Sequence, residues 1–339
     1  MKTLFIKGQN NKTSVLIGNS LNELDNYLTD NTIIITDSKV KSLYVNLFSN
    51  YKVIEIGEGE KNKTLKTVNF IYEKLLEFEA DKTTFLLGFG GGIVCDITGF
   101  VATTFMRGMR FGFVSTTLLS QVDASIGGKN GVNVNGFKNI VGTINQPEFV
   151  ICDSSTLKTL TKNEVSNGFA EIIKHALISD VSMFELLQKQ SVKALKLDSK
   201  TIEHFIYQSI KIKANIVSID EFEAGERKKL NFGHTFGHAI EKNYNFAHGQ
   251  AVSFGIAIAS KLSYKRGYIS IDDYNSIIEL LKHYKLPVDY KFDYNLLLES
   301  IINDKKREQE SISFILLQKI GEAKIEKITL KELKSLIIE

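Results

Sequence analysis

Half of the six histidines in this chain, His234, His238 and His248, fall within fifteen residues of one another. If that stretch is helical, His234 and His238 stand four residues apart and lie on one helix face. Imidazole is the commonest neutral ligand for zinc, and three protein ligands with one open position form the catalytic pattern. The cluster therefore predicts a metal site, with ordinary packed or solvated imidazoles as the alternative.

A carboxylate and a lysine stand three residues apart in the short amphipathic segment 168–176. On a helix, Glu171 and Lys174 share a face, where they form either a solvated ion pair of little value or part of a site. Glu171 would complete a Glu/His/His zinc site, as in hydrolytic zinc enzymes. The acidic run 220–227 just before the histidines is by default a solvated loop, although Arg227 could point into the same site.

The glycine run Gly90–Gly92 follows a predicted strand and opens a predicted helix. Such a turn lets the backbone approach a pyrophosphate, and the helix N-terminus supplies N–H groups, but a purely structural turn fits as well. Polar residues at the ends of other predicted strands favour a dinucleotide, because open α/β sheets bind ligands at that edge. These residues are Asp37, Glu60, Lys63, Thr116 and Thr117.

The stretch 121–139 is polar and rich in glycine, and we expect a loop with little regular structure. Its two lysines, Lys129 and Lys138, and its carboxamides, Asn139 among them, suggest anion recognition. A mobile surface loop with solvated lysines is the alternative.

The elements that must position these residues differ between the two halves of the chain. The first half alternates short apolar strands with helices, which is typical of a parallel α/β sheet. The second half shows helical periodicity and predicts a mainly helical domain. We expect domains at 1–153 and 154–339, with the ligand site in a cleft between them. Strands are expected at 32–36, 53–56, 83–87 and 111–114, and helices at 64–78, 93–105, 167–178, 200–217, 231–242 and 252–266.

The composition is that of a globular protein large enough for two domains. Of the 339 residues, 43% are hydrophobic and 24% charged, and the net charge of +3 argues against a dedicated nucleic-acid binder. Cys95 and Cys152 lie in apolar surroundings without metal-type spacing, so we expect buried free thiols. The start of the chain lacks a signal-like apolar region and no apolar run has the length of a membrane span, so the cytoplasm is the expected location.

Taken together, the motifs resemble those of the 3-dehydroquinate synthase family, in order and spacing, from about Thr32 to Gly321. The resemblance is carried by the segments GGGIVCD at 90–96, FMRG at 105–108, STTLLSQVDASIGGK at 115–129, GFKN at 136–139, AEIIK at 170–174, DEFEAGER at 220–227, NFGHTFGH at 231–238, HG at 248–249 and DKK at 304–306.

This resemblance implies a Rossmann-like, NAD-binding α/β domain followed by a mainly α-helical, metal-binding domain. It implies zinc held by Glu171, His234 and His248, with His238 in proton transfer or hydrogen bonding instead of ligation. Cobalt suits the same ligands. It also implies a homodimer. The residues assigned to NAD binding are Asp37, Glu60, Lys63, Gly91, Gly92, Asp96, Thr116, Thr117, Lys138, Thr156 and Thr159.

In that family the substrate is 3-deoxy-D-arabino-heptulosonate 7-phosphate, which is oxidised at C5, loses phosphate, is reduced again and closes by an aldol step to 3-dehydroquinate. Zinc would polarise substrate oxygens, and the nicotinamide would do the redox chemistry. Glu223 and His238 are implied in proton handling, and Lys129, Lys174 and Asn139 are further catalytic residues. The residues expected to bind substrate are Arg107, Asp123, Lys129, Asn139, Lys174, Lys213, Arg227, Asn231 and one or both of Lys305 and Lys306.

The chain departs from the family pattern at Cys95, usually glycine, at Ser115, usually proline, and at Glu226, usually leucine. The first two would adjust the nucleotide turn, and the third would weaken anion binding if it faced the pocket. The alternatives are a related cyclase acting on sedoheptulose 7-phosphate or glucose 6-phosphate, a metal-dependent polyol dehydrogenase, and a catalytically silent relative.

Overall fold

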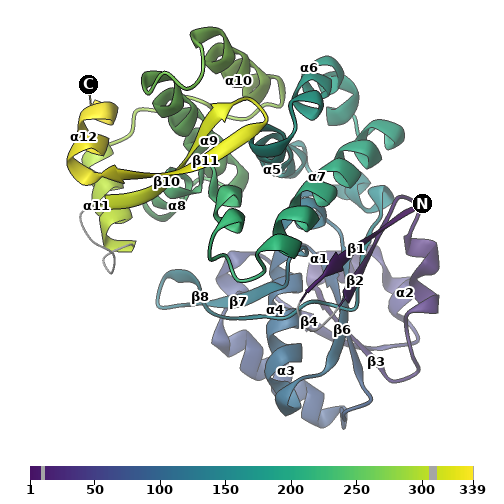
Figure 1. The fold of residues 1–339 in the computed structure, drawn as a ribbon. Helices are drawn as coiled ribbons and strands as arrows, with labels where there is room; N and C mark the ends of the chain where they lie inside the picture. Colours follow the sequence, from purple (N-terminus) through teal and green to yellow (C-terminus); the bar gives the residue numbers. More distant parts are fainter. Residues whose placement is uncertain (9–11, 305–310, 339) are drawn as a thin grey trace. The chain divides into compact units, whose positions relative to one another are not determined.

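The computed structural model describes residues 1–8, 12–304 and 311–338 (Figure 1). The chain forms two compact units, one of Met1–Leu160 with Lys213–Glu221 and one of Thr161–Ile212 with Phe222–Glu339. Residues 154–160 and 213–221 thus belong to the first unit, whereas the predicted ranges assign them to the second domain. The assignment of NAD binding to one range and metal binding to the other stays a prediction.

The first unit is built on a sheet that, within the described residues, has seven strands in the order β1-β2-β9-β6-β5-β3-β4. All neighbouring strands are parallel except β1 and β2, so the predicted parallel α/β fold is confirmed. The strands are β1 (Lys2–Lys7), β2 (Lys12–Ile17), β3 (Thr32–Asp37), β4 (Lys52–Ile56), β5 (Phe85–Gly90), β6 (Arg110–Ser115) and β9 (Phe149–Cys152).

The connections of this sheet run in opposite directions from its middle. Strand β3 leads outward to β4, whereas β5 leads through helix α4 (Gly92–Thr104) to β6 on the other side. The carboxyl ends of β3 and β5 therefore flank the topological switch point, where open α/β sheets bind ligands.

The glycines around β5 are part of the strand and of its contact with α4, not only of a turn. The strand was expected at 83–87 but begins at Phe85 and continues through Gly90. A Cβ at Gly88 would lie 2.9 Å from Thr98 Oγ1, and one at Gly90 would lie 2.6 Å from Val94. The glycines thus let α4 pack directly on the strand, which periodicity alone cannot reveal.

The stretch expected to be a loop is a β-hairpin of β7 (Lys129–Val134) and β8 (Phe137–Ile144). Its turn is Asn135-Gly136, where both residues have positive φ angles, 50° and 81°. Asn-Gly between two extended segments is the strongest short hairpin signal, so the loop prediction for this part of 121–139 was wrong.

The other helical segments of the first unit are short, apart from α3. They are η1 (Leu21–Asn26), α1 (Ser38–Leu43), α2 (Val45–Phe48), η2 (Glu60–Asn62), α3 (Leu65–Glu77), η3 (Phe105–Arg107), the π-turn η4 (Ser120–Ala124) and η5 (Ser154–Thr159).

The second unit is mainly helical, as predicted, but it also contains the hairpin of β10 (Ser311–Lys319) and β11 (Glu322–Thr329), drawn in yellow in Figure 1. The hairpin was not predicted. The helices of the second unit are α5 (Lys162–Ser179), α6 (Val181–Leu195), η6 (Glu226–Asn231), α8 (His234–Asn243), α9 (His248–Lys265), α10 (Ile271–His283), α11 (Tyr294–Asp304) and α12 (Leu330–Ile338). Helix α7 (Ser199–Ile219) begins in the second unit and ends in the first.

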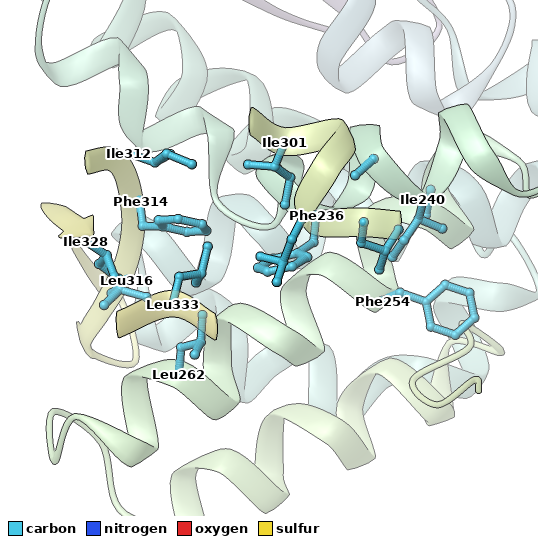
Figure 2. Packing of buried hydrophobic residues seen from close by; sticks show 14 residues of the cluster. Phe236, Ile240, Phe254, Leu262, Ile301, Ile312, Phe314, Leu316, Ile328 and Leu333 are labelled. Carbon is cyan, nitrogen blue, oxygen red and sulfur yellow. The ribbon is translucent and has the colours of Figure 1, made fainter. Parts of the chain in front are cut away.

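An apolar cluster joins this hairpin to α8, α9, α11 and α12 (Figure 2). Phe236 and Ile240 project into it from α8, Phe254 from α9, and Phe314 from β10. The cluster therefore fixes the buried face of α8, which leaves the opposite face for His234. Among the described residues, no helix is both long and apolar enough to cross a membrane.

Candidate active site

Glu171 and Lys174 lie on α5, whose residues 168–178 are all buried. The helix begins with a capping box between Thr161 and Glu164, which satisfies its first N–H groups. Side-chain exposure is 0% for Glu171 and 2% for Lys174, and the two form an ion pair. Removing two charges from water is expensive, so a pair this deeply buried is not the solvated surface pair that was the alternative.

Two imidazoles face the Glu171 carboxylate. His234 is the first residue of α8 and His248 the first residue of α9. Their Nε2 atoms lie 3.4 and 3.5 Å from Glu171 Oε1, and the three ligand atoms of this group lie within 4.8 Å of one another. Both Glu171 oxygens are buried without a hydrogen bond of normal geometry. One carboxylate and two imidazoles are a donor set that fits a divalent cation such as zinc.

Glycines on α9 allow these three elements to meet. A Cβ at Gly249 would lie 2.4 Å from the carbonyl oxygen of Asn167, one turn before Glu171 on α5. A Cβ at Gly255 would lie 1.9 Å from the carbonyl oxygen of Gly233, the residue that precedes His234. The missing side chains bring α9 against both α5 and the start of α8, and this close approach places the ligand atoms together.

The electrostatics of the group keep the carboxylate ionised. Burial alone would raise the pKa of Glu171, but Lys174, His234 and His248 outweigh burial and hold this pKa well below its usual range. Burial, together with Lys174, lowers the pKa of His234 to about 3, so this imidazole is neutral. Burial would lower the pKa of His248, but hydrogen bonds with Glu171 and Glu241 raise this pKa to about 10, so a bound cation would displace a proton from this ring. Ionised carboxylate and neutral imidazole are the forms that bind a metal.

His238 is one turn from His234, but its side chain is exposed and it does not belong to the three-ligand group. The ring centroids of the two histidines lie 5.3 Å apart, with the rings nearly perpendicular. This placement agrees with the expectation that His238 is not a ligand. Its part in proton transfer stays a prediction.

The segment before α8 brings together further predicted residues. The side chain of Asn231 donates a hydrogen bond to Glu223, whose backbone has a positive φ of 62°. Arg227 is buried, whereas Glu226 is exposed and forms an ion pair with Lys229 at 2.7 Å. Lys305 and Lys306 lie outside the residues that the structure describes.

In the first unit, the glycine turn forms a cradle too narrow for side chains. Gly91 is the N-cap of α4 and provides no side-chain hydrogen bond to the helix. A Cβ at Gly91 would lie 3.1 Å from Thr117 Cγ2, and one at Gly92 would lie 2.9 Å from Ala124 Cβ. The first N–H groups of α4 are thus left for an anion, which fits a pyrophosphate.

Asp37 ends β3 on the other side of the switch point. Its Oδ1 accepts a hydrogen bond from the Val40 backbone at 2.8 Å, which caps α1. Burial raises the pKa of this carboxyl. The capping bond accounts for part of the carboxylate, and the remaining acceptor sites fit a ribose hydroxyl.

A hydrogen-bond network joins the Glu60–Lys63 turn to the hairpin. Lys63 Nζ donates to Asp96 and, at 2.5 Å, to Asn139 Oδ1. Asn133 accepts from the backbone N–H of Asn139 at 2.9 Å and donates to Glu60 at 2.7 Å. Asn133 was not among the predicted residues, although Lys129, Lys138 and Asn139 were predicted from the same stretch.

The same network perturbs Asp96. Burial raises the pKa of its carboxyl to about 6, although the neighbouring Lys63 ammonium lowers it. A second, partly buried ion pair of the first unit joins Asp123 to Lys213 at 2.5 Å, and Lys213 Nζ also donates to the Asp123 carbonyl at 2.7 Å. The fold therefore brings together two residues that are 90 positions apart.

The remaining predicted residues of the first unit have varied surroundings. Thr156 is buried and its hydroxyl donates to the Asp153 carbonyl at 2.8 Å. Lys129 and Lys138 are exposed on the hairpin strands, and Arg107 is exposed on η3 with a φ of 63°. The backbone N–H of Thr116 donates to the Gly90 carbonyl at 2.9 Å. The Thr117 hydroxyl donates to Ser120 Oγ at 2.9 Å, and the Thr159 hydroxyl donates to the Thr156 carbonyl at 3.3 Å.

Two departures from the family pattern are in contact with each other. Cys95 Sγ lies 3.9 Å from Ser115 Oγ and 4.0 Å from the Gly90 carbonyl, beneath the glycine turn. Cys95 and Cys152 are both free and buried, as predicted. Burial raises the pKa of Cys95 to about 12, so this thiol stays protonated at neutral pH.

Solved structures of cyclases share this fold. The 2-epi-5-epi-valiolone synthase from Streptomyces hygroscopicus subsp. jinggangensis, solved with NAD+ and Zn2+ bound, superposes with a TM-score of 0.89 at 24% identity, covering 100% of this chain and 98% of that chain. A 2-deoxy-scyllo-inosose synthase complexed with carbaglucose-6-phosphate, NAD+ and Co2+ gives 0.85 at 24% identity, with 99% of each chain covered. These likenesses confirm the predicted fold class.

Sequence relatives extend over most of the chain. The 3-dehydroquinate synthase of Nitratiruptor sp. is 39% identical over 305 residues, which are 87% of this chain and 86% of the relative. That of Pelobacter propionicus is 35% identical over 346 residues, with 97% and 96% covered. The family models for the N-terminal and C-terminal parts of 3-dehydroquinate synthase match residues 53–167 and 168–307. With matches to both models and relatives at 35% and 39% identity over most of its length, this chain belongs to the 3-dehydroquinate synthase family.

Proposed function

We propose that this chain is a 3-dehydroquinate synthase, which converts 3-deoxy-D-arabino-heptulosonate 7-phosphate to 3-dehydroquinate and phosphate. The observation that carries the proposal is the buried Glu171–His234–His248 group in a chain of this family. The reaction oxidises C5, eliminates phosphate, reduces C5 again, opens the ring and closes the carbocycle by an intramolecular aldol addition. It consumes no net oxidant, since the hydride removed in the first step is returned.

Glu171, His234 and His248 would hold zinc or cobalt, and the glycine turn with Asp37 would hold NAD. When bound, the cation supplies Lewis-acid polarisation of substrate oxygens and the nicotinamide supplies the hydride acceptor and donor. Glu60, Lys63 and Asp96 are also proposed to bind NAD beside the glycine turn. Lys63 forms an ion pair with Asp96 and so balances its charge. The other residues proposed for NAD are Thr116, Thr117, Lys138, Thr156 and Thr159.

Lys174 has two proposed tasks. Its ammonium balances the charge of Glu171 when no cation is bound, and it offers donors to a substrate oxygen beside the metal group. Because both side chains are buried, their interaction is not screened by solvent. Lys174 therefore orients the substrate and also keeps the Glu171 carboxylate ionised.

Proton handling is assigned to Glu223 and His238. The hydrogen bond from Asn231 holds the Glu223 carboxylate in place, and the exposed imidazole of His238 is accessible to solvent for exchange of its proton. His is the side chain with an ordinary pKa near neutrality, so it suits a shuttle. The phosphate of the substrate can itself take the proton in the elimination, so a strong protein base is not required.

Basic and amide side chains are assigned to the carboxylate and phosphate of the substrate. They are Arg107, Lys129, Asn139, Lys213, Arg227, Asn231 and one or both of Lys305 and Lys306, with Asp123 for a hydroxyl. The pairing of Lys213 with Asp123 pre-orients both groups. The homodimer and the cytoplasmic location expected from the sequence are kept as parts of this proposal.

One assay tests the proposal. The purified chain is given NAD+, Zn2+ or Co2+, and the heptulosonate phosphate, while phosphate, 3-dehydroquinate and NADH are followed. We expect equal release of phosphate and 3-dehydroquinate without accumulation of NADH. A Lys174→Met variant, which keeps the length of the side chain but removes the charge, is expected to lose most of the rate, whereas the exposed Lys261→Met is a matched control.

The alternative activities give different results in the same assay. Accumulating NADH would identify a polyol dehydrogenase. Turnover of sedoheptulose 7-phosphate or glucose 6-phosphate, without turnover of the heptulosonate, would identify a related cyclase. No turnover of any of these substrates by protein that binds metal and NAD+ would contradict an enzymatic role of this class.

A further inference from the structure

One more acidic residue lies on the site-facing side of α8. His234, His238 and Glu241 are spaced by four and three residues, so they share one helix face. The opposite face carries Phe236 and Ile240 into the apolar cluster of Figure 2. The packing of that cluster therefore sets the rotation of α8 and holds Glu241 on the same side as the metal-binding group.

The two imidazoles of the group are arranged alike. Each directs Nε2 toward Glu171, and each has a hydrogen-bond acceptor near Nδ1. For His234 the acceptor is the backbone carbonyl of Phe232, 3.3 Å from Nδ1. For His248 it is the side chain of Glu241, with Oε2 at 3.4 Å from Nδ1. One ring is thus oriented by the backbone and the other by a carboxylate.

We propose that Glu241 is a positioning residue for the metal ligand His248. By accepting a hydrogen bond from Nδ1–H, its carboxylate fixes the tautomer that leaves the Nε2 lone pair directed at the cation, and it makes the ring a stronger ligand. This inference rests on the proposed metal ligation by Glu171, His234 and His248. It adds a residue that does not touch the cation but determines how well His248 does.

The surroundings of the pair favour this role over a surface contact. The side chains of Glu241 and His248 are 10% and 28% exposed, so solvent screens their interaction only in part. His248 is the first residue of α9, directly after the four-residue connection 244–247. The contact with Glu241 connects the His248 ring at the start of α9 to α8.

The test measures metal affinity, not turnover. Wild type, Glu241→Gln, Glu241→Ala and the control Glu279→Gln, an exposed glutamate on α10, are stripped with a chelator and titrated with Co2+ and Zn2+ against a competing chelator. For Glu241→Ala we expect the affinity to fall by about 10- to 100-fold, the range for loss of an outer-shell partner. Glu241→Gln keeps an acceptor but not the charge, so a smaller loss is expected, and Glu279→Gln should match wild type.

The outcomes separate this inference from the proposed function. Wild-type affinity, together with an unchanged Co2+ absorption spectrum, in both Glu241 variants would overturn the role of Glu241 and leave the metal site intact. Failure of the wild type to bind either metal would instead refute the proposed ligand set. The unfolding midpoint of the metal-free proteins controls for folding, and if Glu241→Ala does not fold, the isosteric Glu241→Gln decides.

Discussion

Lys63 Nζ lies 2.5 Å from Oδ1 of Asn139, which joins a residue proposed for NAD to one proposed for substrate. Lys63 also pairs with Asp96 on α4, so a single ammonium connects the helix after the glycine turn to the β7–β8 hairpin. Lys63 is 5% exposed, and a buried cation with two partners is costly to disturb. Through Lys63, the β7–β8 hairpin is held against α4, the helix that follows the glycine turn.

Asn133→Ala is expected to loosen this hairpin. The substitution removes the acceptor for the Asn139 N–H and the donor to Glu60, while Asn139 must still hold a positive φ of 53°. A loss of about 1 to 2 kcal/mol is expected for the two hydrogen bonds. Hydrogen exchange over residues 129–144 and urea unfolding measure it. Asn69→Ala, on the exposed face of α3, is the control, and equal exchange in both variants would refute the role of Asn133.

His248→Ala is expected to lose bound metal, and His238→Ala to keep it. Of these two histidines, His248 belongs with Glu171 and His234 to a group whose ligand atoms lie within 4.8 Å of one another, and His238 does not. Loss of a direct ligand should weaken binding by more than about 100-fold, beyond the range for an outer-shell partner. Metal content after gel filtration is the measurement, with phosphate release as the second readout. Similar metal loss in the two variants would show that His238 is a ligand after all.

Gly249→Ala is expected to separate α9 from α5. The new Cβ would lie 2.4 Å from the Asn167 carbonyl oxygen, a backbone atom that cannot rotate away. Overpacking of this kind costs about 1 to 3 kcal/mol, and here it also moves His248 away from Glu171. Thermal unfolding and metal titration should both change, whereas the exposed Lys261→Ala on the same helix should change neither. An unaltered metal affinity would mean that α9 shifts without moving its first residue.

Asp96→Asn is expected to alter the pH dependence of stability. The folded pKa of about 6 lies above the ordinary value of 3.8, so between these values the folded state binds more protons than the unfolded state. Wild-type stability therefore falls as pH rises from about 4 to 6, by up to about 3 kcal/mol from this group. The variant lacks this pH-dependent contribution of Asp96. Its free energy of unfolding relative to wild type should therefore rise between about pH 4 and pH 6 and stay constant above pH 6.

Urea midpoints at pH 4, 5, 6 and 7 for both proteins test this prediction. Other carboxyl groups titrate in the same range, but they contribute equally to the two proteins and cancel in the difference. A difference that is constant with pH would mean that Lys63 offsets the effect of burial on Asp96.

The sequence by itself predicted most of the helices and parallel strands and named candidate residues for the chemistry. Buried β-branched runs such as Thr32–Thr36 predicted parallel strands, and helical periodicity predicted α5, α8 and α9, because local apolar patterns report directly on burial. The family motifs then named Glu171, His234 and His248 together. The hairpin at 129–144 was missed although Asn135-Gly136 is a hairpin signal, because its polar, glycine-rich composition favoured a loop. The hairpin at 311–329 was missed because the sequence of one strand does not specify its partner strand.

Only the tertiary structure decided how these residues meet. Glu171 lies more than sixty positions from His234, and the contact between them depends on backbones that approach closely at Gly249 and Gly255. The choice between a solvated and a buried Glu171–Lys174 pair was likewise open until the exposure of both side chains was known. Asn133 and Glu241 carry no motif of their own, because their roles arise from distances between segments, and such distances are set by packing.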